Sequence, residues 1–270
     1  MDRAPLNFAF SPCPNDTFAF HALVHGLVPG PAVEAHLDDI EALNARAERG
    51  EAEITKLSIP AFARVRDRFV LLGAGGAAGF GVGPIVVARE PRAVGGRVAI
   101  PGARTTAALL LRLAGRFETV PMRFDRIEDA VLAGEVDCGV LIHEGRFTFD
   151  GKGLTLVADL GALWESRMGC PLPLAGIAIR RDLAPALAGA VDAALRASVE
   201  HACAHPEASR SYVAAHAQEM DPDVTARHIA LYVNDYTRQL DREAVLRMLE
   251  WGAAEGMFPA PDPTIPSFAP

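Results

Sequence analysis

His143 is the residue of this chain best suited to acid–base chemistry. It follows an apolar segment, Cys138 to Ile142, at a point where packing alone does not require a polar side chain. Imidazole titrates near neutral pH, so a histidine at a strand end suits the work of a general base. The structural alternative is an imidazole that caps the strand end by bonding to the backbone, with the neighbouring Glu144 either tuning it or pointing to solvent. The residues alone leave these interpretations open.

A thiol offers a second kind of chemistry near the N-terminus, in the stretch SPCPNDTFAFHALVHG. Cys13 precedes a predicted helix start, where a thiolate would be stabilised, and His143 could serve as its base. The simpler interpretation is that Cys13 is a turn residue between Pro12 and Pro14. We favour the turn.

Two histidine pairs have the i, i+4 spacing that can hold zinc, namely His21 with His25 and His201 with His205. Neither pair lies in an HExxH motif, and no third ligand is near either pair in the sequence. We therefore predict helix positions for these histidines and no metal site.

Apolar runs bounded by turn residues predict strands that alternate with helices. The first set comprises strands over 6–10, 33–37 and 52–57 with helices over 17–25 and 39–49 and a helix that starts at 58–60. The same order recurs about ninety residues later, with strands over 97–100, 120–124 and 136–142 and helices over 105–114 and 126–133. Two βαβαβ halves predict an α/β fold built from two similar lobes.

The repeat selects one pair of residues in each half. An offset of ninety aligns the loop 11–17 with 101–107, so Asn15 and Asp16 correspond to Thr105 and Thr106. Both pairs begin a predicted helix, where backbone N–H groups and side-chain oxygens can bind an anion.

A second offset, of eighty-four, aligns Ser58 with Ile142, next to His143. The segment Lys56, Leu57 and Ser58 therefore ends a strand equivalent to the one before His143. Ligands of α/β sheets bind beyond the carboxyl ends of the strands. We expect these segments to border a ligand cleft between the lobes.

The rest of the chain connects and covers the two halves. The glycine-rich stretch 73–90 contains a strand over 85–88 that follows the glycines, unlike a phosphate-binding loop, so we interpret the stretch as a crossover. A strand over 173–180 returns the chain to the first lobe. The predicted domains are 1–88 with 175–270, which carries the C-terminal helices, and 89–174. Strand 154–157 and helix 160–167 precede the return. The chain then continues with a helix whose apolar face runs through 187–198 and with helices over 225–236 and 241–255. It ends in a loose proline-rich tail.

Composition limits the classes of partner. The 270 residues carry a net charge of −8, and the absence of a Lys/Arg run excludes nucleic acid as a partner. A small anionic substrate remains compatible, because a local site can oppose the global charge. The sequence shows neither a signal peptide nor an apolar run of the ~20 residues that span a membrane. With four scattered cysteines, these features predict a cytoplasmic protein with reduced thiols.

Five segments carry a family resemblance: SPCPNDTFAFHALVHG (11–26), TKLS (55–58), GVGPIVVAR (81–89), PGARTTA (101–107) and LIHEGRFTF (141–149). Together they resemble the 1,4-dihydroxy-6-naphthoate synthases of the futalosine route to menaquinone, and the likeness covers nearly the whole chain. The resemblance implies the two-lobed fold of type II periplasmic binding proteins in a cytoplasmic enzyme. It also implies a reaction without metal or organic cofactor.

The resemblance further implies a carbon–carbon lyase that cleaves cyclic dehypoxanthine futalosine and releases 1,4-dihydroxy-6-naphthoate. In this family pattern His143 matches the proton acceptor. The matches to substrate-binding segments are Lys56, Leu57 and Ser58, and Thr105 with Thr106. Arg104 departs from the family loop, where histidine is also seen, and receives no role.

Two other functions are compatible with this fold. A solute-binding receptor would hold a small carboxylate without chemistry, but it would need export, and a histidine at the cleft favours catalysis. The sister chorismate dehydratase shares the fold, but the segments SPCPNDTF and LIHE favour the synthase.

Overall fold

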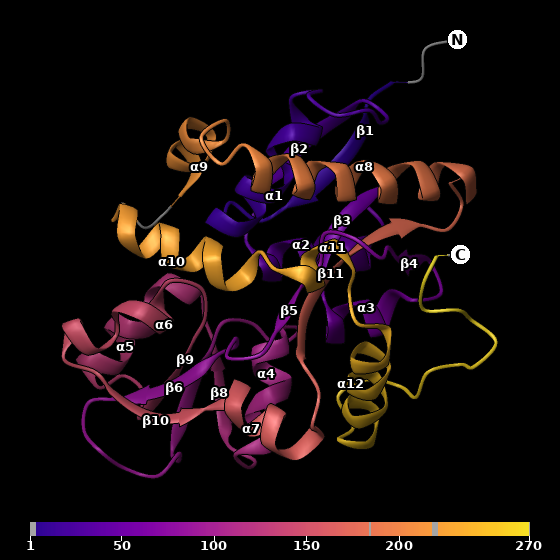
Figure 1. The fold of residues 1–270 in the computed structure, drawn as a ribbon. Helices are drawn as coiled ribbons and strands as arrows, with labels where there is room; N and C mark the ends of the chain where they lie inside the picture. Colours follow the sequence, from indigo (N-terminus) through magenta and orange to yellow (C-terminus); the bar gives the residue numbers. More distant parts are fainter. Residues whose placement is uncertain (1–3, 184, 218–220, 270) are drawn as a thin grey trace. The chain divides into compact units, whose positions relative to one another are not determined.

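The computed structural model describes residues 4–183, 185–217 and 221–269, which form two compact units (Figure 1). Unit 1 combines Met1–Gly79 with Pro173–Pro270, and unit 2 is the continuous segment Phe80–Leu172. The first boundary therefore lies before the strand Ile85–Ala88, whereas the sequence predicted it after residue 88. The reason is strand pairing, because Ile85–Ala88 hydrogen-bonds to strands of unit 2.

Unit 1 is built on a mixed sheet in the order β2-β1-β3-β11-β4, with β5 paired to β11. Its strands are β1 (Leu6–Phe10), β2 (Val33–Leu37), β3 (Ile54–Ser58), β4 (Phe69–Leu71), β5 (Ala77–Gly79) and β11 (Leu172–Arg180). Strands β1, β2 and β3 are parallel, and β11 runs antiparallel to both β3 and β4. The carboxyl ends of β1 and β3 therefore lie at one edge of this sheet.

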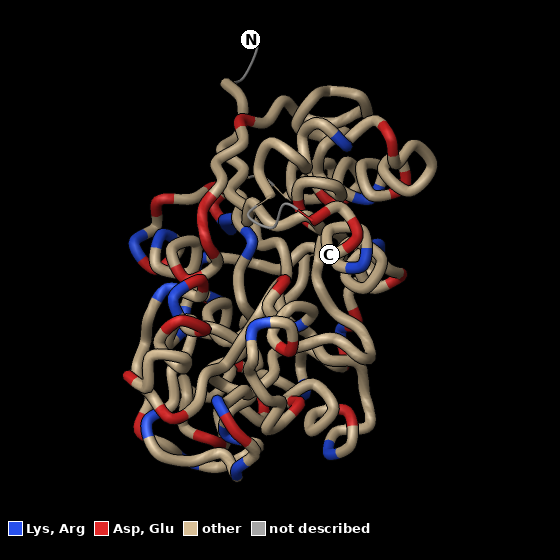
Figure 2. The backbone as a smooth tube through the Cα atoms, turned by 90° about the vertical axis from the view of Figure 1, so that its left-hand side faces the viewer, with Lys and Arg blue, Asp and Glu red and all other residues tan. Residues whose placement is uncertain are grey.

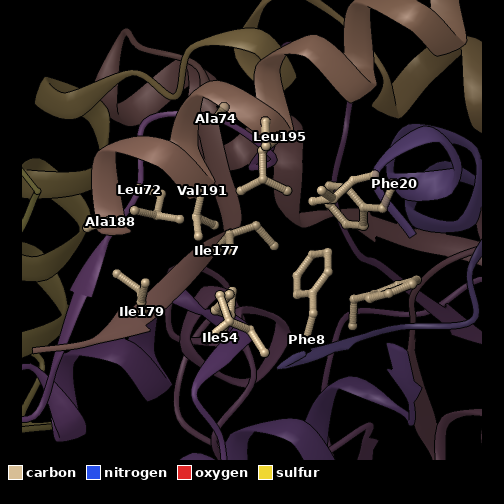
Figure 3. Packing of buried hydrophobic residues seen from close by; sticks show 14 of the residues in the cluster. Phe8, Phe20, Ile54, Leu72, Ala74, Ile177, Ile179, Ala188, Val191 and Leu195 are labelled. Carbon is tan, nitrogen blue, oxygen red and sulfur yellow. The ribbon is translucent and has the colours of Figure 1, made fainter. Parts of the chain in front are cut away.

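The helices of unit 1 are α1 (Pro14–Val24), α2 (Ile40–Arg49), α3 (Ile59–Val65), α8 (Pro185–Ala204), α9 (Arg210–His216), α10 (Pro222–Tyr232), α11 (Asp235–Arg238) and α12 (Arg242–Ala254). Helix α8 packs its apolar face on the sheet, where Val191 and Leu195 meet Phe8 and Ile177 (Figure 3). The face predicted through 187–198 is confirmed except at Ala190, which is exposed. This cluster packs α1 and α8 against β1.

Unit 2 has a smaller sheet in the order β10-β6-β9-β7-β8. Its strands are β6 (Ile85–Ala88), β7 (Arg97–Ile100), β8 (Glu118–Pro121), β9 (Cys138–Leu141) and β10 (Thr155–Asp159). Its helices are α4 (Thr106–Leu110), α5 (Ile127–Ala133), α6 (Gly145–Thr148) and α7 (Leu160–Met168), with 3₁₀ turns at Leu111–Leu113, Phe124–Arg126 and Asp150–Lys152. A separate apolar cluster forms its core.

The strand registers confirm the internal repeat. Each unit has a parallel trio, β2-β1-β3 or β8-β7-β9, with an antiparallel strand beside its last member, β11 or β6. The equivalent pairs are Phe8 with Ile54 and Ala9 with Thr55 in unit 1, and Val98 with Cys138 and Ala99 with Gly139 in unit 2. These pairs are related by the offsets of ninety and eighty-four that the sequence predicted.

Several predicted boundaries were wrong by a few residues. Helix α1 begins at Pro14, not at residue 17, because proline suits the first helical position. The predicted helix 105–114 divides into α4 and a 3₁₀ turn. The predicted helix 225–236 stops at Tyr232, because Asn234 starts a new helix by accepting a hydrogen bond from the N–H of Tyr236.

The C-terminal segment is not the loose tail that its prolines suggested. The N–H of Leu71 donates to the carbonyl of Ser267 at 2.9 Å, and the N–H of Ala269 donates back to Leu71 at 2.8 Å. The Arg66 side chain also donates to two carbonyls of this segment. The edge strand β4 thus satisfies its backbone groups with the tail. The last residue of the predicted tail, Pro270, lies outside the described residues.

The positions of basic and acidic residues are interspersed along the backbone (Figure 2). Unit 2 contains 11 basic and 11 acidic side chains, so the whole net charge of −8 resides on unit 1. Among the described residues, no helix has both the length and the hydropathy to cross a bilayer.

Candidate active site

A buried carboxylate organises the polar residues of unit 1. One oxygen of Asp16 accepts hydrogen bonds from the Asn15 amide at 2.8 Å and from the Lys56 ammonium, with which it forms an ion pair. Its other oxygen accepts from the Ser11 hydroxyl at 2.6 Å. Asp16 is only 2 % exposed and Lys56 5 %. Three donors thus offset the cost of removing this ion pair from water.

The fold explains why these residues meet. Strand β1 leads into the turn that carries Ser11, and α1 begins directly afterwards, so Asp16 stands in its first turn, where the helix dipole favours an anion. Lys56 projects from β3, which pairs with β1. The structure therefore brings together two sequence candidates from separate segments: the pair Asn15 and Asp16, and Lys56.

The hydrogen-bond partner of Ser58 lies on helix α2. It occupies the position before α3 but makes no side-chain cap there. Instead, its hydroxyl accepts from the Asn44 amide at 3.1 Å, and its N–H donates to the Asn44 carbonyl oxygen at 3.1 Å. Leu57 is fully buried in β3, so its side chain belongs to the core.

His228 is a further member of the unit 1 network, and sequence reasoning missed it. Its Nε2 lies 2.9 Å from the Asn15 carbonyl oxygen, and the residue is 1 % exposed on α10. The spacing of Val224, His228 and Tyr232 could have pointed to it, because residues four apart share one face of a helix, and here that face is buried. A histidine within an apolar stripe needs a polar partner.

In unit 2, Thr105 builds the start of α4. Its hydroxyl donates to the carbonyl of Gly102 at 2.8 Å and accepts from the N–H of Ala108 at 3.1 Å. Because its only hydrogen is used by Gly102, this hydroxyl offers a ligand an acceptor lone pair and no donor. Thr106 is the first residue of the helix and is buried.

His143 has an unusual backbone. Over the described ranges it is the one non-glycine residue with a positive φ, +54°. Its half-buried ring meets Phe124 edge-on, with centroids 5.0 Å apart. A non-glycine residue in the left-handed region costs on the order of 1–3 kcal/mol, and such strain is concentrated at functional sites. The residue follows β9, which neighbours β7, so His143 and Thr105 follow carboxyl ends at the same sheet edge.

The remaining sequence candidates lie in helical surroundings. Cys13 is buried at the position before α1, and its carbonyl accepts from the Thr17 hydroxyl at 3.1 Å. The rings of His21 and His25 stack 4.3 Å apart, and both lie beside Tyr212 of α9. Within the part of the chain that the structure describes, no three His, Cys, Asp or Glu side chains are arranged to hold a metal ion.

We expect the stability of unit 1 to fall as the pH drops below about 6.5. Burial lowers the pKa of His21 from its ordinary 6.5, and the neighbouring His25 and His201 lower it further. The unfolded chain therefore binds a proton in this window that the folded chain resists, which favours unfolding at acidic pH. Urea unfolding at pH 7.5 and 5.5 measures the loss, and His21→Phe should reduce it. An equal loss in the variant would contradict the assignment.

A cavity of about 500 Å³ lies between α1, α9 and α10. Phe18, Val213 and Ile229 give it an apolar wall, and its polar lining consists of Ser209, Arg210 and Thr225. The described lining of this cavity therefore supplies no imidazole or carboxylate for general acid–base chemistry.

Comparison with known proteins decides the family. A family model described as menaquinone biosynthesis matches residues 6–254. The chain is 50 % identical over 266 residues to a 1,4-dihydroxy-6-naphthoate synthase of Thermus thermophilus, covering 96 % of this chain and 98 % of the relative. The chain belongs to the menaquinone biosynthesis family. The resemblance noted in the sequence is thereby confirmed.

Solved structures place the menaquinone biosynthesis family member among known folds. A crystal structure of an Archaeoglobus fulgidus protein has a TM-score of 0.90 and 39 % identity, covering 94 % of this chain and 98 % of that one. The alkanesulfonate-binding protein of Xanthomonas axonopodis, solved with MOPS, has a TM-score of 0.72 and 13 % identity, with 96 % of each chain covered. The two-sheet α/β fold is that of the periplasmic binding proteins, as predicted.

Proposed function

We propose that this chain, an enzyme of the menaquinone biosynthesis family, is a carbon–carbon lyase that converts cyclic dehypoxanthine futalosine to 1,4-dihydroxy-6-naphthoate. The observation that carries the proposal is its 50 % identity to a synthase of that product. We further propose that the enzyme works in the cytoplasm on this small anionic substrate.

The proposed mechanism gives His143 the role of general base. A neutral imidazole removes one proton from the substrate, which starts the fragmentation, and aromatisation of the ring makes the cleavage favourable. The strained backbone of His143 supports this role, because strain persists where the fold holds a residue for a task.

Residues of both units are proposed to bind the substrate. Those of unit 1 are Asn15, Asp16, Lys56, Leu57 and Ser58, and those of unit 2 are Thr105 and Thr106. Lys56 is the cation suited to an anionic group, and it forms a buried ion pair with Asp16. The main chain of Leu57 would take part, since its side chain is in the core.

A second candidate function is non-catalytic binding of a small carboxylate. It is favoured by the fold shared with the alkanesulfonate-binding protein, although a likeness at 13 % identity shows the fold alone. Binding without turnover would distinguish this function from the lyase.

The deciding experiment incubates purified, folded protein with cyclic dehypoxanthine futalosine and follows naphthoate by absorbance and mass. We expect product to form at a rate proportional to enzyme. A parallel incubation with chorismate tests the sister dehydratase reaction. Folded protein that yields no naphthoate would refute the lyase, and a thermal shift without product would favour the binding protein.

Thr106→Val is expected to raise KM about tenfold or more, because a hydrogen bond to a charged group contributes about 1.5–3 kcal/mol. Valine preserves the shape of this buried residue and removes the hydroxyl. Thr105→Val is a companion variant and not a control, because Thr105 is also proposed to bind the substrate: it removes the cap of α4 and should cost about 1 kcal/mol of stability. Steady-state kinetics and thermal denaturation measure the two effects. An unchanged KM in Thr106→Val would place the substrate carboxylate elsewhere.

A further inference from the structure

The Asn15 side chain joins two helices through an amide whose orientation is determined. One terminal atom of this amide lies 2.8 Å from an Asp16 carboxylate oxygen, and the other terminal atom lies 2.9 Å from Nε2 of His228. An ionised carboxylate can only accept hydrogen bonds, so the amide must turn its NH₂ group toward Asp16. Its carbonyl oxygen then faces His228, and Nε2 of His228 must carry a hydrogen and donate it.

The resulting chain of donors ends at the cation of the site. His228 donates to Asn15, Asn15 donates to Asp16, and the same Asp16 oxygen also accepts from Lys56. Every member is at least nine-tenths buried. Water is therefore a poor substitute for any of them, and a change at one end of the chain is felt at the other.

We infer that His228 is a positioning residue for the proposed reaction. By donating to Asn15 it fixes the amide, the amide orients the Asp16 carboxylate, and the carboxylate holds the Lys56 ammonium in place for the anionic substrate. The inference rests on the proposed function, in which Lys56 binds substrate. It extends the site to helix α10, where the sequence contains no recognised motif.

Packing alone does not account for a histidine at this position. The neighbours of His228 on the buried face of α10 include Val224 and Tyr232, and helix α10 contacts α1. An apolar side chain would pack there without the cost of burying an imidazole. The feature that an apolar residue cannot supply is the N–H group that faces Asn15.

A positioning role and a purely structural role predict different kinetics. Lys56 would hold a group that carries charge in both the substrate and the transition state, so its displacement raises KM and leaves kcat nearly unchanged. If the His228–Asn15 hydrogen bond only holds α1 and α10 together, its loss lowers the stability and the fraction of active enzyme. The KM of the folded fraction then stays the same.

The test compares His228→Leu with His228→Gln. The Gln amide can present an N–H at about the reach of Nε2, whereas Leu fills the space without a donor. We expect His228→Leu to raise KM about tenfold with kcat within about twofold, and His228→Gln to restore KM to within about threefold of the wild type. Crystal structures of both variants should show Asn15 and Lys56 displaced in the first and in place in the second.

Thermal denaturation of each variant separates stability from positioning. An unchanged KM in His228→Leu, or an Asn15–Asp16–Lys56 arrangement that its crystal structure shows intact, would overturn the inference. A stable His228→Gln that fails to restore KM would also overturn it. Folded wild-type protein without turnover would instead refute the proposed function, and the positioning role would be lost with it.

Discussion

An asparagine at position 143 is expected to lower kcat by about 10²–10⁴-fold while the substrate still binds, because this is the usual contribution of a general base. Asparagine has no group that accepts a proton near neutral pH. It also tolerates the left-handed backbone, so the φ of +54° can be kept. The substitution therefore removes the chemistry and preserves the local structure.

Two further variants at this position separate strain from catalysis. His143→Gly should be inactive and lose the backbone strain, on the order of 1 kcal/mol, whereas His143→Ala should be inactive and keep it. Steady-state kinetics with naphthoate detection measures turnover, and a ligand-induced thermal shift measures binding. Near-normal turnover in His143→Asn would remove this residue from the base role and leave the structural interpretation.

The substitution Asp16→Ala should lower the free energy of unfolding by about 3–5 kcal/mol, the usual cost of leaving a buried charge without its partner. Lys56 would keep its ammonium group in a site that is 5 % exposed, with its ion pair removed. Because folded domains are stable by only about 5–15 kcal/mol, a loss of this size is readily measured. Urea denaturation followed by circular dichroism provides the measurement.

The matched control removes both charges in the double variant Asp16→Leu with Lys56→Met. Replacing a whole buried ion pair by apolar side chains is often neutral, so the double variant should be more stable than Asp16→Ala. It should nevertheless be inactive, since Lys56 is proposed to bind the substrate. A loss below about 1 kcal/mol in Asp16→Ala would show that the pair is exposed in solution.

The fold was largely predictable because its signals are local. The ranges of β1, β2, β6 and β7 were predicted without error, since each is a short apolar or alternating segment bounded by turn residues. The strands β4 and β5 were missed. Each has three residues and depends on pairing with β11, a segment about a hundred residues away. Such pairing leaves no periodic pattern in the sequence.

Most residues of the candidate site could be predicted from the sequence, but the hydrogen bonds between them could not. The repeat pointed to Asn15, Asp16 and Lys56 individually, because their positions recur at equivalent strand and helix ends. Their contacts depend on how β3 lies beside β1, which the sequence does not encode locally. His228 was missed for the same reason, since its hydrogen-bond partner Asn15 is 213 residues away.

The order of strands in unit 1 has a consequence for how the chain is made. Strand β11 lies between β3 and β4 but is the last strand of its sheet to be synthesised. Unit 2 is continuous and leaves the ribosome complete, while the first five strands of unit 1 still lack their central neighbour. At about 5–20 residues per second, the roughly 100 residues between the end of β4 and the start of β11 take roughly 5–20 s to appear. During that interval β3 and β4 present open edges, so the nascent chain needs protection from aggregation while it waits for its own middle strand.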